Sequence, residues 1–372
     1  MNNEGMMNRN CIFHIPWKLD DNLNVASDIR PMKICNALKA IGYNVEIIWG
    51  SAKERRKHIK RIRLLIKNGV KFDFMYSESS TLPTLLTEPH HLPTSPFLDF
   101  SFFRFCKKYK IPIGLFYRDI YWNVKEVNRF GRFKQLYSKF FHLYDILKYN
   151  SSIDVLFLPH EKMRQYISLL KNAVRHTHLY PGADNVLVET VFNKNILYVG
   201  GVNPQLYDVS VMIEAFKDTD ASLILCCRER EWKVHKNYYE HLLSENVQIR
   251  HLNTNEIKNI YHTISYTIMF FPPKEYRKLA TPFKLFEYIG NEKPIISSNN
   301  SAASDYIKTN DIGFVLECKT LTLRNFLLDL PTKNIYQKKI INIKKTKQEN
   351  LWEKRAEKIA QELSDCDYNE EK

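Results

Sequence analysis

A lysine and a glutamate stand three residues apart in the stretch 281–298, TPFKLFEYIGNEKPIISS. Thr281 suits the N-cap of a helix and Pro282 suits its first position, so the pattern predicts that a helix begins here. Lys284 and Glu287 would share one face of that helix. The first N–H groups of a helix lack internal partners and carry the positive end of its dipole, so this end is suited to bind an anion.

The spacing of these two charges suits a nucleoside diphosphate that carries a sugar. Lys284 and the helix N–H groups would bind the phosphates, and Glu287 would accept hydrogen bonds from neutral sugar hydroxyls. Charge-assisted bonds of this kind contribute about 1.5–3 kcal/mol. The alternative is a surface ion pair worth about 0–1 kcal/mol, and the spacing alone favours that alternative.

Another pair of charges follows an apolar run in the first half of the chain. The stretch GLFYRDIYW places Arg118 and Asp119 at the carboxyl end of an expected strand. Asp119 could take a proton from a reacting hydroxyl, while Arg118 could pair with Asp119 or with a phosphate. The alternative is a structural Arg–Asp pair that holds the loop.

Short apolar strands alternate with amphipathic helices in both halves of the chain. This alternation predicts an α/β protein with doubly wound parallel sheets. A turn-rich segment, 179–195, separates the halves, so we expect two domains, 1–185 and 190–346, with a C-terminal helix over 347–365 that returns to the first. In such folds ligands bind at the carboxyl ends of the strands, and two facing sheets predict a cleft site.

The opening stretch resembles the P-x-K-L-x-E-Y-x-x-x-x-K-P-V-I-x-S motif of GT-B glycosyltransferases, in particular the retaining family-four (group 1) enzymes of bacterial polysaccharide synthesis. Other pieces resemble the family in its own order: SDIRPMKICNALKAIGYNVEIIWG, YSESSTLPTLLTEPHHLP, FYRDIYW, LYPGAD, ILYVGGVNPQLYDVSVMIEAF, NDIGFVLE and NLWEKRAEKIAQEL. The resemblance implies two Rossmann-like domains facing across a cleft. The first would bind the acceptor and the second a nucleotide-diphosphate sugar, with no other cofactor.

The resemblance also implies roles for residues of the second domain. Glu287 would bind the ribose or the donor sugar and take part in catalysis, and Lys284 would bind the diphosphate. Gly200 and Gly201 would let their loop approach the phosphates, because a residue without Cβ permits close contact. Arg228 would be a second phosphate cation whose planar fork suits two oxygens, although a solvated arginine is an equal alternative.

On the acceptor side we expect Arg118 to contact the acceptor, with Glu78 and His90 or His91 lining the same site. Hydrogen bonding within the loop is the alternative for the histidines. We expect no metal, because adjacent histidines in an extended segment point to opposite sides and no cysteine or histidine stands nearby at zinc spacing. Asp119 would be the base of an inverting enzyme. In a retaining enzyme, which the resemblance favours, the leaving phosphate would take the proton and Asp119 would orient the acceptor.

The sequence departs from the family in two places. Many members carry two glutamates eight positions apart, and Leu279 stands at the earlier position. This departure leaves the identity of the donor sugar open. The segment KLDDNLNVAS contains no glycine, although the family has a glycine-rich first loop in the acceptor domain.

Composition and charge indicate the partners and the cellular location that we expect for the protein. The 372 residues carry a formal net charge of +14, which attracts polyanions such as anionic lipid, nucleic acid or phosphorylated substrates. Seven scattered cysteines without a CxxC pair, and an N-terminus without a signal pattern, favour a cytoplasmic protein. The basic helix expected over 53–68 could also lie peripherally on the inner face of the membrane, since each basic residue near anionic lipid contributes about 1 kcal/mol. The alternative for this helix is a solvated face.

Together these observations predict a glycosyltransferase of the hexosyl type that acts on a glycan or lipid-linked glycan, in capsule or lipopolysaccharide synthesis. One alternative is a nucleic-acid-binding protein, but the stretch FYRDIYWNVKE interleaves aromatic residues with acids as well as bases, so we expect no nucleic-acid partner. Another is a catalytically idle GT-B scaffold in a polysaccharide assembly complex. Leu279 is compatible with that alternative, while Lys284 and Glu287 argue against it.

Overall fold

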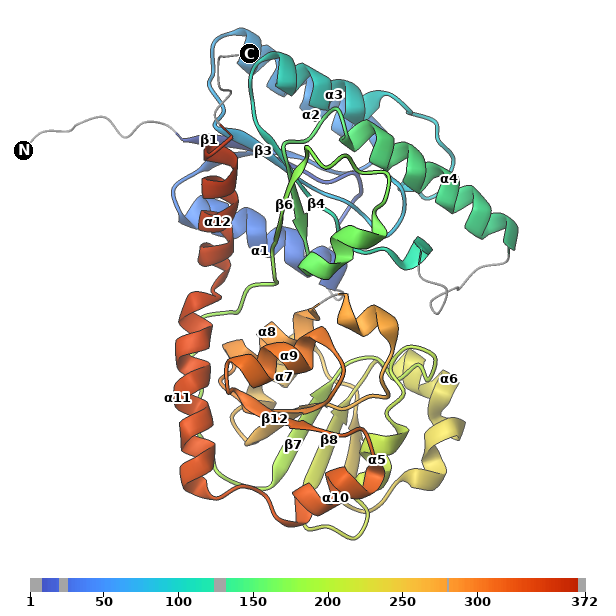
Figure 1. Ribbon diagram of the computed structural model, residues 1–372, viewed down its shortest axis with the longest axis vertical. Helices are drawn as coiled ribbons and strands as arrows, with labels where there is room; N and C mark the ends of the chain where they lie inside the picture. The colour runs from blue at the N-terminus through green and yellow to red at the C-terminus, as the bar shows by residue number, and fades with distance from the viewer. Residues whose placement is uncertain (1–8, 20–25, 124–131, 280, 367–372) are drawn as a thin grey trace, which may run out of the picture. The chain divides into compact units, whose positions relative to one another are not determined.

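The computed structural model describes residues 9–19, 26–123, 132–279 and 281–366, which form two compact units (Figure 1). Unit 1 comprises Met1–Pro181 with Trp352–Lys372, and unit 2 comprises Gly182–Leu351. Each unit contains one six-stranded sheet in which every pairing is parallel. The predicted α/β class with two doubly wound domains is confirmed.

Unit 1 has the strand order β2-β1-β3-β4-β5-β6, so the chain changes direction across the sheet between β1 and β3. Its strands are β1 (Asn10–His14), β2 (Asn44–Ile48), β3 (Phe74–Glu78), β4 (Ile113–Phe116), β5 (Val155–Leu158) and β6 (Arg175–His178). Its helices are α1 (Ala26–Ala40), α2 (Ala52–Lys67), α3 (Leu98–Lys108), α4 (Arg132–Tyr149) and α12 (Trp352–Ser364), with short turns η1 (Thr84–Leu86), η2 (Tyr121–Asn123) and η4 (Glu161–Tyr166).

Unit 2 has the order β12-β11-β10-β7-β8-β9, and its change of direction lies between β7 and β10. Its strands are β7 (Asn195–Val199), β8 (Ser222–Cys226), β9 (Val247–Arg250), β10 (Tyr266–Met269), β11 (Ile295–Ser298) and β12 (Gly313–Leu316). Its helices are α5 (Ser210–Ala215), α6 (Glu229–Tyr239), α7 (Thr254–Ile260), α8 (Phe283–Gly290), α9 (Ala302–Thr309), α10 (Thr320–Leu328) and α11 (Lys333–Glu349), with turns η5 (Glu240–Leu242) and η6 (Glu275–Lys278).

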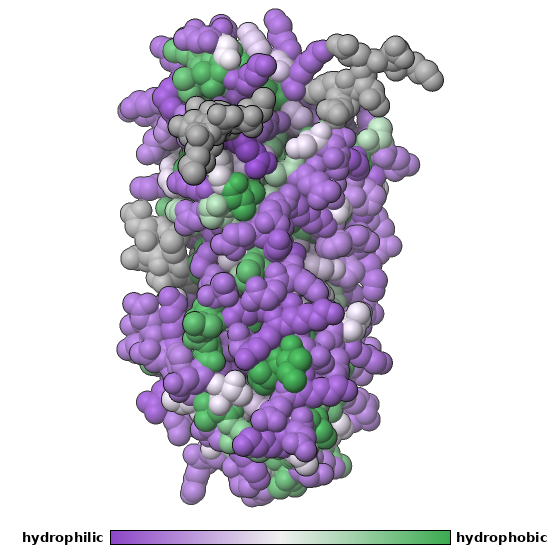
Figure 2. Space-filling model, turned by 90° about the vertical axis from the view of Figure 1, so that its left-hand side faces the viewer, coloured by the Kyte–Doolittle hydropathy of each residue, from purple (hydrophilic) through white to green (hydrophobic). Residues whose placement is uncertain are grey.

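The central strands are buried along their whole length. β3, β4, β5, β10 and β11 have no exposed residue, as expected for parallel strands that are covered by helices on both faces. On the face of the molecule shown in Figure 2, by contrast, hydrophilic residues predominate and hydrophobic residues form small, separated spots.

Two helix boundaries differ from the sequence prediction. The helix predicted over 347–365 is two helices, because Asn350 ends α11 and Leu351 forms a parallel bridge with Ala183 before α12 begins. At the start of α8 the cap position belongs to Pro282, whose backbone is extended, and Thr281 makes no cap hydrogen bond. Proline lacks an N–H group and favours extended backbone before it, so the helix begins one residue later than expected.

A buried polar cluster joins four elements of unit 1. His14, at the end of β1, contacts Ser77 of β3 through Nδ1 at 2.9 Å and Asp99 of α3 through Nε2 at 3.0 Å. Arg55 of α2 donates to both carboxylate oxygens of Asp99, from Nε at 3.0 Å and Nη2 at 3.2 Å. Burial raises the pKa of Asp99, but the hydrogen bond with His14 and the charge of Arg55 outweigh it, so the net shift is downward.

Replacing Asp99 with alanine is expected to destabilise unit 1 by about 3–5 kcal/mol, because it leaves the buried Arg55 with only its longer ion pair, to Glu88 at 3.4 Å. Since the pKa of Asp99 is lowered on folding, its contribution is complete above the unfolded value of about 4 and is lost as the pH falls below that value. Urea unfolding of the wild type and Asp99→Ala between acidic and neutral pH measures both effects. Glu161→Ala, which removes the exposed partner of His178, is the control and should cost at most about 1 kcal/mol. An equal cost for both variants would contradict the assignment.

Candidate functional site

The start of α8 lies at the point where the strand order of unit 2 reverses. The loop after β7 begins at Gly200, whose N–H donates to the carbonyl of Cys226 on β8 at 2.9 Å. Lys284, in the first turn of α8, reaches this loop. Leu285, Phe286, Tyr288 and Ile289 are buried in the core of unit 2, so Lys284 and Glu287 remain as the partly exposed side of the helix. The site therefore occupies the switch point at which α/β sheets bind ligands.

Lys284 lies among aromatic groups. Its Nζ donates to Tyr198 Oη at 3.3 Å and lies 4.5 Å from the centre of the Tyr198 ring and 5.3 Å from that of Tyr207. Burial lowers the pKa of Lys284 to about 8, with the charge of Arg277 acting in the same direction and that of Glu287 opposing it. Within the described part of the chain, Lys284 forms no salt bridge. The ion-pair alternative for Lys284 and Glu287 is therefore not what the structure shows.

Gly200 gives Lys284 the space it occupies. A Cβ at Gly200 would lie 1.6 Å from Lys284 Nζ and 2.9 Å from Tyr198 Oη. The neighbouring Gly201 faces Tyr207 and Glu231, which a Cβ would meet at 2.9 and 3.0 Å. The Lys284 amine thus lies directly against Gly200, whose φ of 158° also favours glycine. The role of Gly200 and Gly201 in phosphate binding stays a prediction.

The carboxylate of Glu287 is held by Tyr261, the residue at the C-cap of α7. Its Oε1 accepts a hydrogen bond from Tyr261 Oη at 3.1 Å, and among the described residues its Oε2 has no hydrogen-bond partner. Burial raises the pKa of Glu287, while the Tyr261 hydrogen bond and the charge of Lys284 act against that rise. One carboxylate oxygen is thus fixed and the other is available to a ligand hydroxyl.

Two polar groups near the start of α8 are buried without a partner among the described residues. The sequence analysis expected one of them, Thr281, only as an N-cap and did not single out the other, Arg277. Thr281 Oγ1 and Arg277 Nε have no hydrogen-bond partner in the described structure. The Arg277 guanidinium lies 4.4 Å from the centre of the Phe271 ring and donates from Nη2 to the carbonyl of Leu206 at 2.6 Å. Arg277 comes from η6, so no spacing within the motif could reveal it.

The loop after β7 is also fixed by residues that the sequence did not single out. Glu231 of α6 accepts hydrogen bonds from the N–H groups of Val202 at 2.9 Å and Asn203 at 3.0 Å. Tyr198 Oη donates to the carbonyl of Gly201 at 2.6 Å. These contacts hold the backbone on which the Gly200–Lys284 contact depends.

Two further residues that the sequence analysis discussed for the donor side differ in exposure. Arg228 is exposed and stands at the N-cap of α6, in the short connection that follows β8. Its role as a phosphate cation stays a prediction. Leu279 is buried and offers no hydrogen-bonding side chain, so it supplies no contact for a donor sugar.

In unit 1 the structure brings Glu78, Arg118 and Asp119 together at the carboxyl ends of β3 and β4. Arg118 contacts Glu78 Oε2 at 3.5 Å and donates to the Ser79 carbonyl at 3.3 Å. Burial lowers the pKa of Arg118, and the nearby Arg30 adds to that effect while Glu78 opposes it. Asp119 is partly exposed, and its Oδ2 accepts a hydrogen bond from Thr81 Oγ1 at 2.7 Å.

Glu78 has no exposed surface. Its carboxylate pairs with Arg30 and accepts a hydrogen bond from Tyr76 Oη at 3.0 Å, in addition to its contact with Arg118. The predicted lining role of Glu78 therefore has no accessible atom to support it. Its visible role is to position Arg118.

The two histidines are exposed and bond within their own loop. His90 Nδ1 accepts from the N–H of Leu92 at 3.0 Å, and His91 Nδ1 lies 2.9 Å from the carbonyl of Leu86. His91 has a φ of 51°, which places it in a tight turn. These contacts match the loop-bonding alternative and do not connect either histidine with Asp119. Among the described residues there is no cluster of three or more His, Cys, Asp or Glu side chains that could hold a metal.

Solved structures share this architecture over nearly the whole chain. HepE from Anabaena in complex with UDP-glucose matches with a TM-score of 0.62 at 10% sequence identity, covering 96% of this chain and 99% of that one. A glycosyltransferase from Rickettsia africae matches with a TM-score of 0.62 at 14% identity, over 96% and 99%. WaaG, a glycosyltransferase involved in lipopolysaccharide biosynthesis, matches with a TM-score of 0.57 at 14% identity, over 95% and 99%.

The chain has the GT-B fold. At these identities the likeness shows the fold alone. No family model matches the sequence, and neither does any curated protein.

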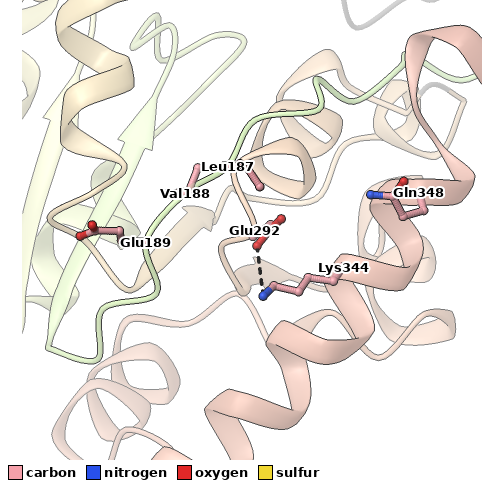
Figure 3. Close-up of a pocket in the computed structure, with 6 residues that line it drawn as sticks. All are labelled: Leu187, Val188, Glu189, Glu292, Lys344 and Gln348. Atoms are coloured by element: carbon pink, nitrogen blue, oxygen red, sulfur yellow. Dashed lines mark ion pairs between the residues drawn. The ribbon is translucent and has the colours of Figure 1, made fainter.

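Unit 2 of this GT-B chain also has a hollow of about 410 Å³ at the opposite end of α8 (Figure 3). Glu292, which follows α8, contacts Lys344 at 3.8 Å and the buried Lys347 at 2.9 Å. The carboxylate of Glu292 is thus paired within the protein, whereas Lys284 forms no salt bridge with a described residue. The lining residues are Leu187, Val188, Glu189, Glu292, Lys344 and Gln348.

The Gly200–Lys284 contact can be tested by a double-mutant cycle. Gly200→Ala is expected to destabilise unit 2 by about 1–3 kcal/mol, because the new methyl group displaces the Lys284 amine from Tyr198. In a Lys284→Ala background the same change should cost less, with a coupling energy of about 0.5–3 kcal/mol, measured by urea unfolding. Equal costs in both backgrounds would show that Gly200 serves another purpose, such as its backbone conformation.

Proposed function

We propose that this protein transfers a sugar from a nucleotide-diphosphate donor to a hydroxyl of a glycan or lipid-linked glycan in surface polysaccharide biosynthesis. The observation that carries the proposal is the state of Lys284. It is a partly buried ammonium at the switch point, it has no salt bridge to any described residue, and it lies beside a glutamate with one available oxygen. Such a pair is costly to retain unless a ligand completes it.

A diphosphate would supply the hydrogen-bond acceptors and the negative charge that the described residues do not provide for Lys284. Its oxygens would accept the N–H bonds that Lys284 does not use within the protein, and its charge would offset those of Lys284 and Arg277. Glu287 Oε2 would accept a hydrogen bond from a hydroxyl of the ribose or the donor sugar. No cofactor besides the nucleotide sugar is needed for this chemistry.

The structural neighbours support the donor class. HepE was solved in complex with UDP-glucose, and a trehalose-phosphate synthase described as UDP-forming, with glucose-6-phosphate bound, matches over 95% of this chain with a TM-score of 0.58. WaaG acts in lipopolysaccharide biosynthesis, which supports a surface glycan as product. These neighbours support the proposal by fold, and the contacts of Lys284 and Glu287 support it by chemistry.

For the acceptor we propose Arg118 and Asp119. Glu78 fixes Arg118, which leaves the partly exposed Asp119 as the carboxylate at the ends of β3 and β4 that can meet a hydroxyl. In an inverting route Asp119 takes the proton of that hydroxyl, and in a retaining route the leaving phosphate takes it while Asp119 orients the acceptor.

The two alternative functions fit the site less well. A protein that stacks nucleic-acid bases needs accessible aromatic faces, whereas Tyr198 and Phe271 beside Lys284 are buried. An idle scaffold would gain nothing from an ammonium held without a carboxylate partner.

We place the reaction in the cytoplasm, on the inner face of a membrane. A lipid-linked acceptor and the net charge of +14 both favour that location. No described helix has the length and apolar composition required to cross a bilayer.

The test combines a donor screen with an isosteric variant. One nucleoside diphosphate should raise the unfolding temperature, and the matching nucleotide sugar should be hydrolysed or transferred. Glu287→Gln, which keeps the shape but removes the charge, should lower turnover about 10- to 150-fold, the range expected for a charge-assisted hydrogen bond.

The matched control is Glu317→Gln, which alters an exposed carboxylate paired with Lys319 in the same unit. It should leave turnover unchanged. The proposed donor site would be refuted if no nucleoside diphosphate raised the unfolding temperature. Near wild-type turnover in Glu287→Gln would refute it as well.

A further inference from the structure

Helix α4 displays its apolar residues to solvent. The exposed fractions are 91% for Phe133, 70% for Leu136, 43% for Tyr137, 64% for Phe140 and 56% for Leu147. At about 100° per residue these positions fall on one side of the helix. They form an apolar stripe along α4, densest over Phe133–Phe140, and the helix is about 27 Å long at 1.5 Å per residue.

The opposite side of α4 attaches the helix to unit 1 through polar and aromatic groups. The His142 ring stacks on Trp122 of η2 with centroids 5.1 Å apart. Asp145 Oδ2 accepts a hydrogen bond from the N–H of Thr84 at 2.6 Å, and Thr84 Oγ1 lies 3.0 Å from Tyr149 Oη. The orientation of α4 is thus fixed by specific contacts, and the apolar stripe is left outside them.

The charges beside the stripe have one sign. Lys134 and Lys139 are exposed, and their helical positions lie on either side of the stripe. Lys148 lies 5.0 Å from the centre of the Tyr144 ring. The single acidic residue of α4 is Asp145, which is buried on the opposite side. The outer surface of the helix therefore combines aromatic and aliphatic groups with lysines.

We propose that α4 lies flat on a bilayer surface that contains anionic phospholipid, with the stripe among the acyl chains and the lysines at the phosphates. An apolar face bordered by lysines is the pattern of helices that lie in a membrane interface. A second copy of the chain fits less well, because pairing two identical stripes would bring lysines together without an acidic residue to meet them.

This proposal assigns membrane contact to a different helix from the one the sequence suggested. In α2 the apolar residues Ile59 and Ile62 are buried, Arg55 is buried against Asp99, and Arg61 pairs with Glu46. Helix α2 could attract lipid by charge, whereas α4 offers charge and an insertable apolar face together. The inference does not depend on the donor site.

Sedimentation with lipid vesicles tests the proposal on the full-length protein. The wild type should bind vesicles of phosphatidylcholine with phosphatidylglycerol, and bind much less to phosphatidylcholine alone. The double variant Leu136→Ser, Phe140→Ser should bind the mixed vesicles at least about tenfold more weakly, because it removes two large apolar groups from the stripe. Lys134→Gln with Lys139→Gln should lower binding to the mixed vesicles only.

The control is Leu64→Ser, which removes an apolar residue of α2 that is 54% exposed, and its binding should match that of the wild type. All these positions are exposed, so urea unfolding should remain within about 0.5 kcal/mol of the wild type. Absence of binding to the mixed vesicles, or equal binding by the stripe variant, would overturn the proposal. So would a dimer in light scattering that the stripe variant dissociates, since α4 would then join copies of the chain. Stabilisation by a nucleoside diphosphate should be the same in every variant, which separates this result from the donor site.

Discussion

The candidate site depends on one electrostatic constraint: the ammonium of Lys284 is partly withdrawn from water, and no carboxylate of the described residues lies at salt-bridge distance from it. Among the described buried cations, Arg55 pairs with Asp99 and Lys347 with Glu292, whereas Lys293 donates to the backbone carbonyl of Glu189 at 3.2 Å. Lys284 has instead a tyrosine hydroxyl and two aromatic faces, which stabilise a cation more weakly than an ion pair at close range. At the start of α8, a polyanionic ligand would remove this imbalance.

The surrounding residues hold the Lys284 amine and the Glu287 carboxylate in this arrangement. Gly200 admits the amine, Glu231 fixes the loop that carries Gly200, and Tyr261 holds one oxygen of Glu287 so that the other stays available. The change of strand direction between β7 and β10 brings the loop and α8 to the same edge of the sheet. In unit 1 a comparable edge carries Arg118 and Asp119, but there Glu78 already compensates the arginine. The two units thus differ in whether their cation is paired.

The sequence was sufficient for the architecture, because near-continuous apolar runs followed by turn residues identify parallel strands and their carboxyl ends. It also placed Lys284 and Glu287 on one helix face. It could not reveal Arg277 or Glu231, since these residues reach the site from other elements. It also could not decide whether His90 and His91 line the acceptor site or bond within their own loop. Helix α4 shows most clearly what sequence reasoning could not predict. Its apolar spacing by itself predicts a buried face, and only the contacts of His142 and Asp145 on the other side show that this face is exposed.

The central claim is that Lys284 binds an anionic ligand, and the most direct test is the pKa of its amine. Heteronuclear NMR of isotope-labelled lysine, with Lys284→Arg to assign the resonance, would follow the titration in the free protein and with each nucleoside diphosphate. The account predicts a pKa of about 8 in the free protein and a rise when a nucleoside diphosphate binds. An ordinary lysine pKa of about 10.4 that no nucleoside diphosphate alters would contradict it.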